Sequence, residues 1–442
     1  MIQSTQQPRL PNIAGRSTSL PERSTDTRTR SINTDNVELT ASTSKRPDML
    51  QRLIRRRLVA KLRTLTQGAI RFSDSVSSEV FGNAVAETKD FSLAVQDPAF
   101  YGRIATGGSL GFAESYLLGE WKTDDLTGLL RTLYQHFDAA DSIGIVPHIG
   151  RLLRSTVGPL HRNTRDKSKR QIAAHYDLSN DFFRLFLDPT MMYSSAWFAD
   201  PETSLHAASV AKLERICQKL RLQPNDNILE IGTGWGGLAL HVVENHDCDI
   251  TTTTISKAQL THARQRFAEA GIADRIRLLE SDYRDLVGQF DKLVSIEMVE
   301  AVGERFLDTY FRCCGRLLRP GGKFAMQAIV MPESRYKSYR HGTDFIQKYI
   351  FPGGFLPSVA AMQESVGRVS DLRLETVEDM SSHYARTLEC WRNRFFKHLP
   401  EVRELGFDDR FIRMWEYYLC YCEAAFREQA VRVVQIVWDK PQ

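Results

Sequence analysis

The residues whose types and spacing most clearly suggest chemistry are Gly232, Gly234, Gly236 and Gly237, which directly follow the apolar segment 228–231. Glycine lets the backbone turn sharply and lets a ligand approach more closely than any Cβ would allow. The next residues are helical in character, and the start of a helix offers unpaired N–H groups. The pattern therefore predicts a strand, a turn and a helix that hold part of a nucleotide.

The charge around this turn distinguishes between two kinds of nucleotide ligand. Glu230 lies in the segment leading into the turn, and the glycine-rich loop contains no Lys or Arg. A carboxylate would repel a pyrophosphate but tolerates a cationic or uncharged ligand. A ligand without a bound pyrophosphate is thus favoured over a phosphate-binding dinucleotide site.

Further segments supply the elements that position this loop. Strands are expected at 249–256, 275–280, 291–297 and 324–330, with a turn at 318–323 before the last. Helical stretches alternate with them, which predicts an α/β fold: a doubly wound, Rossmann-like parallel sheet whose ligand lies at the strands' carboxyl ends. The glycine loop resembles motif I of class I S-adenosylmethionine (SAM)-dependent methyltransferases, and this resemblance implies SAM as cofactor.

Composition limits the other classes. With 442 residues the chain can form two domains, and its net charge of +4 argues against a nucleic-acid partner. No apolar run is long enough to span a membrane, and the N-terminus has no secretory core. The seven cysteines lack zinc-type spacing, so we expect reduced thiols in a cytoplasmic protein and no metal site.

The chain divides into four expected regions. Residues 1–48 are polar and poor in aromatic residues, which predicts a disordered tail. Residues 49–150 form a small accessory domain for lipid engagement or dimerisation, residues 151–170 a basic linker, and residues 171–442 the catalytic domain. The linker is either a solvated connector or a lipid-headgroup contact.

The accessory domain begins with a basic amphipathic helix within residues 48–65, which either lies on an anionic lipid surface or packs on its own domain. Short strands are expected at 69–73 and 91–95. The glycines of the segment 107–121 punctuate a helix, and its aromatic residues offer a packing or homodimer face.

Four longer motifs carry a sharper resemblance. They are His-Tyr-Asp-Leu-Ser-Asn-Asp-Phe-Phe at 175–183, Met-Tyr-Ser-Ser-Ala-Trp-Phe at 192–198, Ser-Ile-Glu-Met-Val-Glu-Ala-Val-Gly at 295–303 and Lys-Tyr-Ile-Phe-Pro-Gly-Gly-Phe-Leu-Pro-Ser at 348–358. Together they resemble the cyclopropane-fatty-acyl-phospholipid synthase family, which is related to the mycolic acid cyclopropane synthases. The likeness covers roughly residues 90–440.

The resemblance implies an enzyme that transfers a methylene group from SAM to the cis double bond of an unsaturated phospholipid acyl chain. A carbocation forms and then loses a proton as the ring closes. Such a site must exclude water, tolerate positive charge and provide a base. Aromatic faces and carboxylates suit the cation.

In the resembled family the base is a bound bicarbonate. Matched motif by motif, its partners here are Glu300, Gln327, Tyr384 and the backbone amides of Ser195 and Ile329. Gln327 replaces a histidine and Ser195 a cysteine of the family pattern. The residues also allow other interpretations: Glu300 as a carboxylate at a helix N-terminus, Tyr384 as a core residue bonded to backbone, and Gln327 as an exposed residue.

The resemblance also implies cofactor and substrate contacts. Those to SAM are expected from Tyr193, Ser194, Gly232, Gly234, Thr254, Ile255, Gln259, Asp282, Tyr283 and Arg284. The acyl channel is expected along Phe345, Tyr349, Phe351 and Phe355, because a long chain needs an apolar lining. The same aromatic stretch is equally compatible with ordinary core.

The sequence thus predicts a cyclopropane-fatty-acyl-phospholipid synthase that works peripherally on the inner face of the membrane, with phospholipid as substrate. A close alternative shares the cation but gives a methyl- or methylene-branched chain, and Gln327 motivates it. A second alternative, motivated by the basic helix, is a lipid-surface binding protein without activity. Binding of SAM separates that scaffold from an enzyme.

Overall fold

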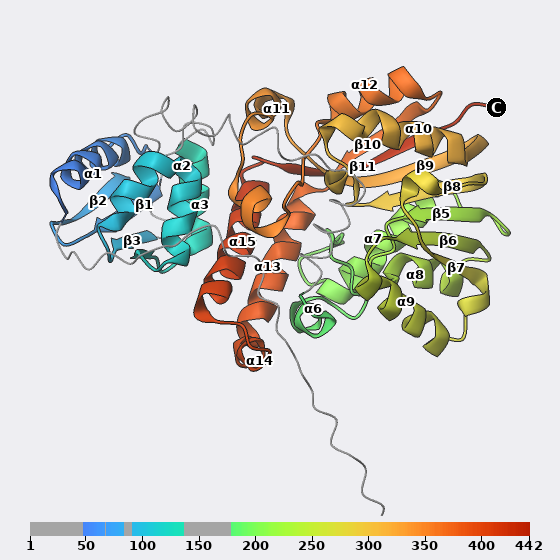
Figure 1. Cartoon of the computed structure of the whole chain (residues 1–442), viewed down its shortest axis with the longest axis horizontal. Helices are drawn as coiled ribbons and strands as arrows, with labels where there is room; N and C mark the ends of the chain where they lie inside the picture. Colours follow the sequence, from blue (N-terminus) through green and yellow to red (C-terminus); the bar gives the residue numbers. More distant parts are fainter. Residues whose placement is uncertain (1–46, 67, 84–90, 137–177) are drawn as a thin grey trace, which may run out of the picture. The chain divides into compact units, whose positions relative to one another are not determined.

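The computed structural model describes residues 47–66, 68–83, 91–136 and 178–442 (Figure 1). Nearly all of the expected tail, the whole basic linker and residues 175–177 of the first long motif lie outside this part of the chain. Residues Ala41–Gln442 form one compact unit.

The larger sheet carries the catalytic region. Its strand order is β10-β11-β9-β8-β5-β6-β7, with β7, β6, β5, β8 and β9 mutually parallel and β11 antiparallel to both β9 and β10. The strands are β5 (Asn227–Ile231), β6 (Asp249–Thr254), β7 (Ile276–Glu280), β8 (Phe290–Ile296), β9 (Leu318–Val330), β10 (Arg373–Asp379) and β11 (Arg432–Asp439). The predicted doubly wound sheet is confirmed.

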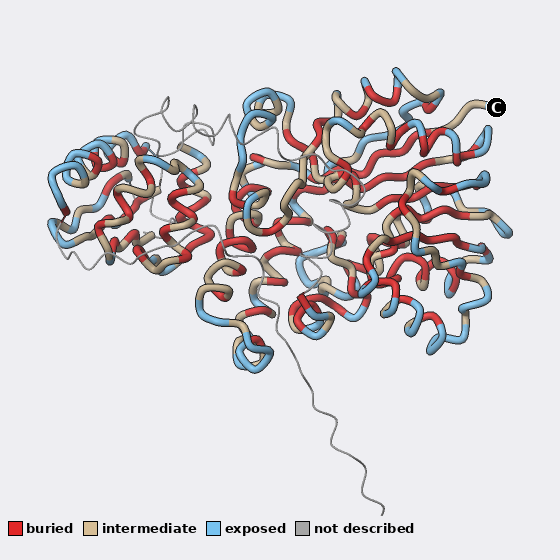
Figure 2. Tube along the Cα trace, in the orientation of Figure 1, coloured by how far each residue is buried: buried red, intermediate tan, exposed pale blue. Residues whose placement is uncertain are grey.

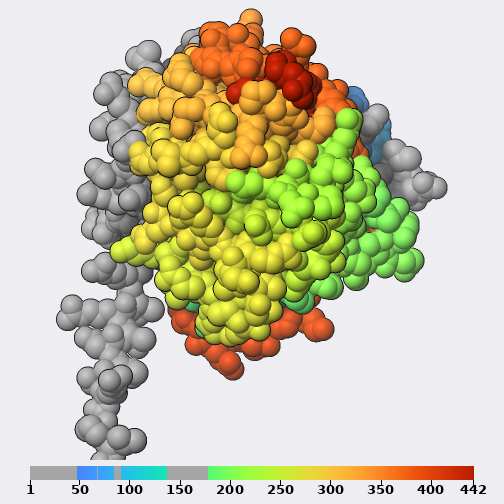
Figure 3. Space-filling model, turned by 90° about the vertical axis from the view of Figure 1, so that its right-hand side faces the viewer, coloured from blue at the N-terminus to red at the C-terminus, as the bar shows by residue number. Residues whose placement is uncertain are grey.

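Helices cover both faces of this sheet because its strands alternate apolar side chains between two cores (Figures 1 and 2). Ile228 and Val294 pack with α7, α8 and α9, whereas Leu229 and Leu293 pack with α10 and α12. The helices of this region are α6 (Asn180–Phe186), α7 (Leu205–Leu220), α8 (Gly237–Asn245), α9 (Lys257–Glu269), α10 (Leu307–Leu317), α11 (Glu333–Tyr339), α12 (Val359–Val369), α13 (Ser381–Lys397), α14 (Leu399–Glu404) and α15 (Asp409–Arg427). Figure 3 shows the face covered largely by the green and yellow segments that carry β5 to β8.

The expected strands of the catalytic region are present, with one correction. Residues 318–323 were expected to be a turn, yet they belong to β9. Pairing with β8 jumps from Leu318 opposite Phe290 to Lys323 opposite Lys292, so a bulge accommodates the extra residues. Gly321 has φ +76°, and its N–H donates to the Lys440 carbonyl, which satisfies the backbone within the bulge.

The accessory region has its own sheet, with strand order β2-β1-β3-β4. Its elements are α1 (Met49–Leu62), β1 (Gly68–Ser73), β2 (Ser78–Asn83), β3 (Phe91–Val95), α2 (Ala99–Leu117), β4 (Trp121–Lys122) and α3 (Leu126–His136). The expected strands at 69–73 and 91–95 are β1 and β3. Gly108, with φ +56°, kinks α2, and Phe112 and Trp121 pack internally at 4.4 Å between ring centroids.

The basic amphipathic helix is α1, which begins after Asp48 in a capping box with Gln51. Its inner face buries Ile54, Leu58, Val59 and Leu62. Its first turns nevertheless leave three apolar side chains in solvent: Met49 is 87 % exposed, Leu50 65 % and Leu53 49 %. The helix therefore packs on its own domain and also presents an apolar surface.

The accessory region contacts the catalytic region through α3 and α15, where Arg131 pairs with Glu428 at 2.7 Å. Glu114 of α2 also accepts hydrogen bonds from Lys348 and Tyr349, at 2.6 and 2.9 Å. Among the described residues, no helix combines the length and apolar character needed to cross a membrane.

Candidate active site

The parallel strands place several of the expected site residues along one edge of the sheet. Gly232 follows β5, Gln259 lies just beyond β6 and Asp282 follows β7; the same edge carries Glu297 just after β8, which was not among the expected residues. Carboxyl ends of parallel strands meet at the same edge, which is where open α/β sheets bind their ligands.

The glycine loop has the shape of a ligand cradle. Gly232, Gly234 and Gly236 have φ of +106°, +54° and +85°, a region that other residues rarely adopt. A Cβ built on Gly234 would meet no atom within 4 Å, so open space lies beside this backbone. Both Gly232 and Thr233 donate to the Thr253 carbonyl, which fixes the loop against β6.

The ends of β6 and β7 carry the remaining expected SAM contacts. The Thr254 hydroxyl donates to Gln259 Oε1 at 3.1 Å, so an uncharged pair stands where β6 ends, beside Ile255. Asp282 forms a two-armed ion pair with Arg284, at 2.7 and 2.6 Å, and Arg284 also lies over the Tyr283 ring. Together with the open glycine loop, this mostly uncharged donor set fits SAM.

Tyr193 and Ser194 lie in a shell of aromatic and polar side chains. The hydroxyl of Tyr193 is 2.8 Å from that of Tyr418, and its ring packs 5.2 Å from Trp391 and 5.3 Å from Phe183. Ser194 Oγ accepts a hydrogen bond from Lys212 Nζ at 3.0 Å. The expected cofactor residues therefore connect directly to a buried cation.

Lys212 is fully buried on α7 among acidic groups. Burial lowers the pKa of Lys212 to about 8, against the opposing effects of Glu297, Asp188 and Glu230. Burial likewise raises the pKa of Glu230 to about 8, although Thr252 donates to its carboxylate at 2.6 Å. Burial thus weakens the charge of Lys212 and of Glu230 alike.

Glu297 lies at the centre of the predicted catalytic residues. Its Oε1 accepts hydrogen bonds from the Ser195 amide at 2.8 Å and from Gln327 Nε2 at 2.7 Å, and its carboxylate also bonds Tyr384. Its φ is +47°, which is strained for a residue with a Cβ. Burial raises the pKa of Glu297, while these hydrogen bonds and Lys212 favour its charged form.

Glu300 occupies a second position, three residues further on, in the short helix η4 (Val299–Ala301). Its Oε1 accepts from the Ile329 amide at 2.5 Å, whereas its buried Oε2 has no hydrogen-bond partner among the described residues. Burial and the neighbouring charge of Glu297 raise the pKa of Glu300 to about 8. The two carboxyl groups therefore differ: Glu297 has several donors, and Glu300 favours the protonated state at neutral pH.

The structure thus brings together all five predicted catalytic residues. Their hydrogen bonds go to carboxyl groups of the protein itself, those of Glu297 and Glu300. The Ser195 amide already donates to Glu297, and the Ile329 amide donates to Glu300. A bicarbonate ion would need these same donors and would lie beside two acidic side chains. In this arrangement the residues do not fit a bound bicarbonate.

Two of the alternative interpretations conflict with these contacts. Gln327 is 1 % exposed and links Glu297 to Gln435, whose amide donates to Gln327 Oε1 at 2.9 Å, so it is not an exposed residue. Tyr384 is a buried residue whose hydroxyl bonds a carboxylate rather than only backbone.

The four predicted channel residues separate into two pairs. Phe351 lies 6.3 Å from the Tyr193 ring, and the Phe355 amide donates to the Glu300 carbonyl at 2.8 Å. Phe345 packs on Tyr417 of α15, and Tyr349 bonds Glu114 of the accessory region. Phe351 and Phe355 therefore contact residues of the site, whereas Phe345 and Tyr349 contact α15 and the accessory region.

Comparison with known proteins agrees with this geometry. The family model described as mycolic acid cyclopropane synthetase matches residues 163–436. The chain belongs to this family. Its members include SAM-dependent methyltransferases, and the chain is an enzyme of that class.

Two curated relatives cover most of the chain. Tuberculostearic acid methyltransferase UfaA1 of Mycobacterium tuberculosis is 41 % identical over 386 residues, 84 % of this chain and 88 % of the relative. Cyclopropane-fatty-acyl-phospholipid synthase of Escherichia coli is 35 % identical over 361 residues, 81 % of this chain and 90 % of the relative.

A solved structure supports both fold and cofactor. Mycolic acid cyclopropane synthase CmaA1, complexed with SAH and CTAB, is 31 % identical with a TM-score of 0.58, and the match covers 62 % of this chain and 98 % of that chain. This supports SAM as the cofactor of the present chain.

Sequence reasoning missed the roles of Glu297 and Lys212. Glu297 stands inside a quoted motif, three residues before Glu300, and this spacing of two acids was its available signal. Lys212 falls on the buried face of an amphipathic helix with Ala208 and Ile216, where a lone lysine is the only indication.

Proposed function

We propose that this enzyme transfers the methyl carbon of SAM to the cis double bond of unsaturated acyl chains esterified in phospholipid, with a cyclopropane ring as product. The observation that carries the proposal is the buried Glu297–Glu300 pair at the sheet edge, beside the glycine loop and an aromatic shell. SAM supplies an electrophilic methyl group when bound. The residues of the chain must then stabilise positive charge and remove one proton.

The charge of the site supports this role. The Glu297 carboxylate lies near one buried lysine, and the rings of Tyr193, Trp391 and Phe351 line the same region. Carboxylates and aromatic faces stabilise a cation in a space from which water is excluded. The site is therefore suited to a sulfonium ligand and to a cationic acyl chain.

We assign the base to Glu297. Its carboxylate has several hydrogen-bond donors that keep it charged, and burial raises its pKa, which strengthens it as a base. Glu300, with a pKa near 8, is protonated at neutral pH and does not compete for this role. Gln327 and Tyr384 hold the Glu297 carboxylate in place.

A methylene-branched acyl chain is the second candidate product; a saturated methyl branch would need a reductant in addition. Loss of a methyl proton with bonding to the adjacent cationic carbon closes a ring. A hydride shift between the two former alkene carbons before that proton loss leaves a methylene branch (=CH2) on the open chain instead. The 41 % identity to a tuberculostearic acid methyltransferase favours this candidate.

We further propose that α1 brings the enzyme to an anionic phospholipid surface at the inner face of the membrane. Met49, Leu50 and Leu53 are exposed, and Arg52 and Arg56 stand exposed on the same helix. Exposed apolar side chains next to basic ones suit the boundary between headgroups and acyl chains.

The function is tested by incubating the full chain with SAM and vesicles of monounsaturated phosphatidylglycerol, followed by mass spectrometry and NMR of the acyl chains. A cyclopropane signal supports the first product, and the signal of a methylene branch (=CH2) supports the second. Acyl chains that gain no carbon under conditions where calorimetry shows SAM binding would contradict both. Activity that depends on added bicarbonate in carbonate-free buffer would contradict the assignment of Glu297 as base.

A further inference from the structure

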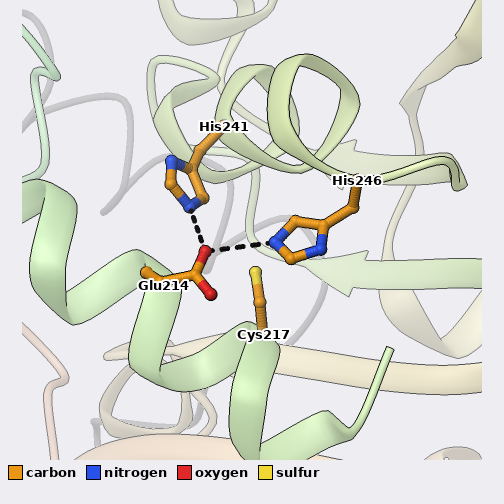
Figure 4. Close-up of side chains that lie close together, drawn as sticks. All are labelled: Glu214, Cys217, His241 and His246. Carbon is orange, nitrogen blue, oxygen red and sulfur yellow. Dashed lines mark hydrogen bonds and ion pairs between the residues drawn. The ribbon is translucent and has the colours of Figure 1, made fainter. Parts of the chain in front are cut away.

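A second group of chemically reactive side chains lies between α7 and α8. It consists of Glu214 and Cys217 on α7, His241 on α8 and His246 at the C-terminal end of α8 (Figure 4). One potential metal-binding atom from each residue lies within 4.8 Å of the others. We call these four residues the α7–α8 cluster.

The two helices explain why these residues converge. Glu214 and Cys217 are three residues apart and so share one face of α7. His241 lies on α8, which ends at Asn245, and His246 adopts an extended conformation with its N–H bonded to the Val242 carbonyl at 2.8 Å. The chain therefore leaves the helix in a way that brings both imidazoles over Glu214 (Figure 4).

Two of the distances within the cluster match those between ligands of a tetrahedral zinc ion. Glu214 Oε2 is 3.2 Å from His241 Nε2 and 3.1 Å from His246 Nε2. Zinc bonds of 2.0 to 2.1 Å place neighbouring tetrahedral ligands about 3.3 Å apart. The Cys217 sulfur points toward the carboxylate and the His246 ring (Figure 4).

A metal-free explanation accounts for only part of this arrangement. A carboxylate that accepts hydrogen bonds from two histidines is a common surface interaction, and Glu214 is 37 % exposed. Cys217 belongs to the apolar core beside Ile216 and Leu220, yet its sulfur points toward the carboxylate (Figure 4). Two nitrogens, one oxygen and one sulfur form a donor set typical of zinc, whereas calcium and magnesium prefer oxygen alone.

We propose that the α7–α8 cluster binds one zinc ion. Coordination by the Cys217 sulfur releases its thiol proton to solvent, and the two imidazoles bind through Nε2. The thiolate and the Glu214 carboxylate together balance the double charge of the ion. Cysteine spacing alone does not reveal the site, because the chain contributes a single cysteine and the other ligands come from two helices.

The position of the cluster indicates a structural role that reaches the active site. α7 carries Lys212, and α8 starts directly after the glycine loop. A zinc ion would cross-link these two helices at a point outside the active site. It would thereby restrain both the loop and the buried lysine.

The test uses the full chain, stripped with a chelator and then titrated with zinc chloride against a chromophoric competitor. One zinc per chain should bind, and the Tm should rise by a few degrees. His246→Ala should weaken binding by more than the roughly 10- to 100-fold that loss of an outer partner costs. His262→Ala, a histidine on α9 outside the cluster, is the matched control and should bind zinc as the unmodified chain does.

Cobalt replacement tests the thiol directly. The cobalt-loaded chain should show a near-ultraviolet thiolate charge-transfer band and the intense visible bands of a tetrahedral ion. Cys217→Ser should abolish the charge-transfer band, whereas Cys313→Ser should retain it. If Cys217→Ser does not fold, Glu214→Gln replaces it as the test variant, because Glu214 is partly exposed, and this variant should weaken zinc binding. Failure to bind zinc, or zinc affinity unchanged in His246→Ala, would overturn the proposal.

Discussion

Replacing Glu297 separates the proposed base from every other group in the site. Glu297→Gln preserves the shape of the side chain and an oxygen that can accept from Ser195 and Gln327, but it removes the basic carboxylate. Loss of a general base lowers turnover by roughly 100- to 10,000-fold. At 1.36 kcal/mol per tenfold change, this corresponds to about 3 to 5 kcal/mol of lost transition-state stabilisation. Binding of SAM should change little.

Glu297→Gly adds a measurement of strain at the same position. With φ of +47°, Glu297 adopts a conformation that costs a residue with a Cβ about 1 to 2 kcal/mol and that glycine adopts freely. Removing a buried carboxylate also removes its desolvation penalty. We therefore expect Glu297→Gly to lose turnover, while the released strain offsets only part of the cost of leaving the Ser195 amide and the Gln327 amide without their acceptor.

The assay measures labelled acyl chains from radioactive SAM and vesicles, with denaturant unfolding in parallel. Glu375→Gln on β10, whose carboxylate pairs with Lys323 and Arg221, is the matched control and should retain turnover. Bicarbonate added to Glu297→Gly tests whether a free anion can take the vacated place. If Glu297→Gln kept more than half of the normal turnover, the assignment of Glu297 as base would be refuted.

Three further outcomes follow from the same contacts. Glu300→Gln should keep SAM binding in calorimetry and lose far less turnover than Glu297→Gln, because glutamine resembles the protonated carboxyl group of Glu300. Because the pKa of Glu300 is raised to about 8, its contribution to the free energy of unfolding is present at low pH and is lost as pH rises toward 8. The free energy of unfolding of Glu300→Gln should therefore depend less on pH between about 4.5 and 8 than that of the unmodified chain. An unchanged pH profile would contradict the pKa assignment. Tyr193→Phe should lower the free energy of unfolding by about 1 kcal/mol, because it removes the hydrogen bond to Tyr418. The effects of Tyr193→Phe and Tyr418→Phe on unfolding should be non-additive in the double variant. Simple additivity would show that the two hydroxyls do not interact. Leu50→Ser with Leu53→Ser should weaken sedimentation with anionic vesicles but leave turnover on detergent-dispersed lipid intact, and equal loss in both assays would argue against α1 as the membrane contact.

Much of the sheet could be predicted from sequence because its signals are local. The glycines after β5 and the β-branched residues of β6 specify strand and turn without knowledge of distant contacts. By contrast, β2 reads Ser-Glu-Val-Phe-Gly-Asn with only Phe81 buried, and the edge strand β10 is almost wholly exposed, so neither has an apolar pattern to recognise. β11 is apolar, but its antiparallel place between β9 and β10 depends on tertiary pairing.

The site shows the same division. The motifs identified Glu300, Gln327 and Tyr384 as neighbours, and the structure places all three around one centre. The hydrogen bond from the Ser195 amide to Glu297 depends on the left-handed backbone conformation of Glu297 and on contact between two segments about a hundred residues apart. Such a contact leaves no local trace in the sequence.

The most direct test of the proposed function supplies trideuteromethyl SAM with monounsaturated phospholipid vesicles and determines the deuterium content of the added carbon. If the methyl group is transferred to the double bond and then loses a proton, the new carbon of the acyl chain should retain two deuterium atoms. That carbon should lie either in a ring or in a methylene branch. An added carbon that keeps all three deuterium atoms would contradict the proton removal assigned to Glu297. Acyl chains without label, from a protein that binds SAM, would contradict the proposed substrate.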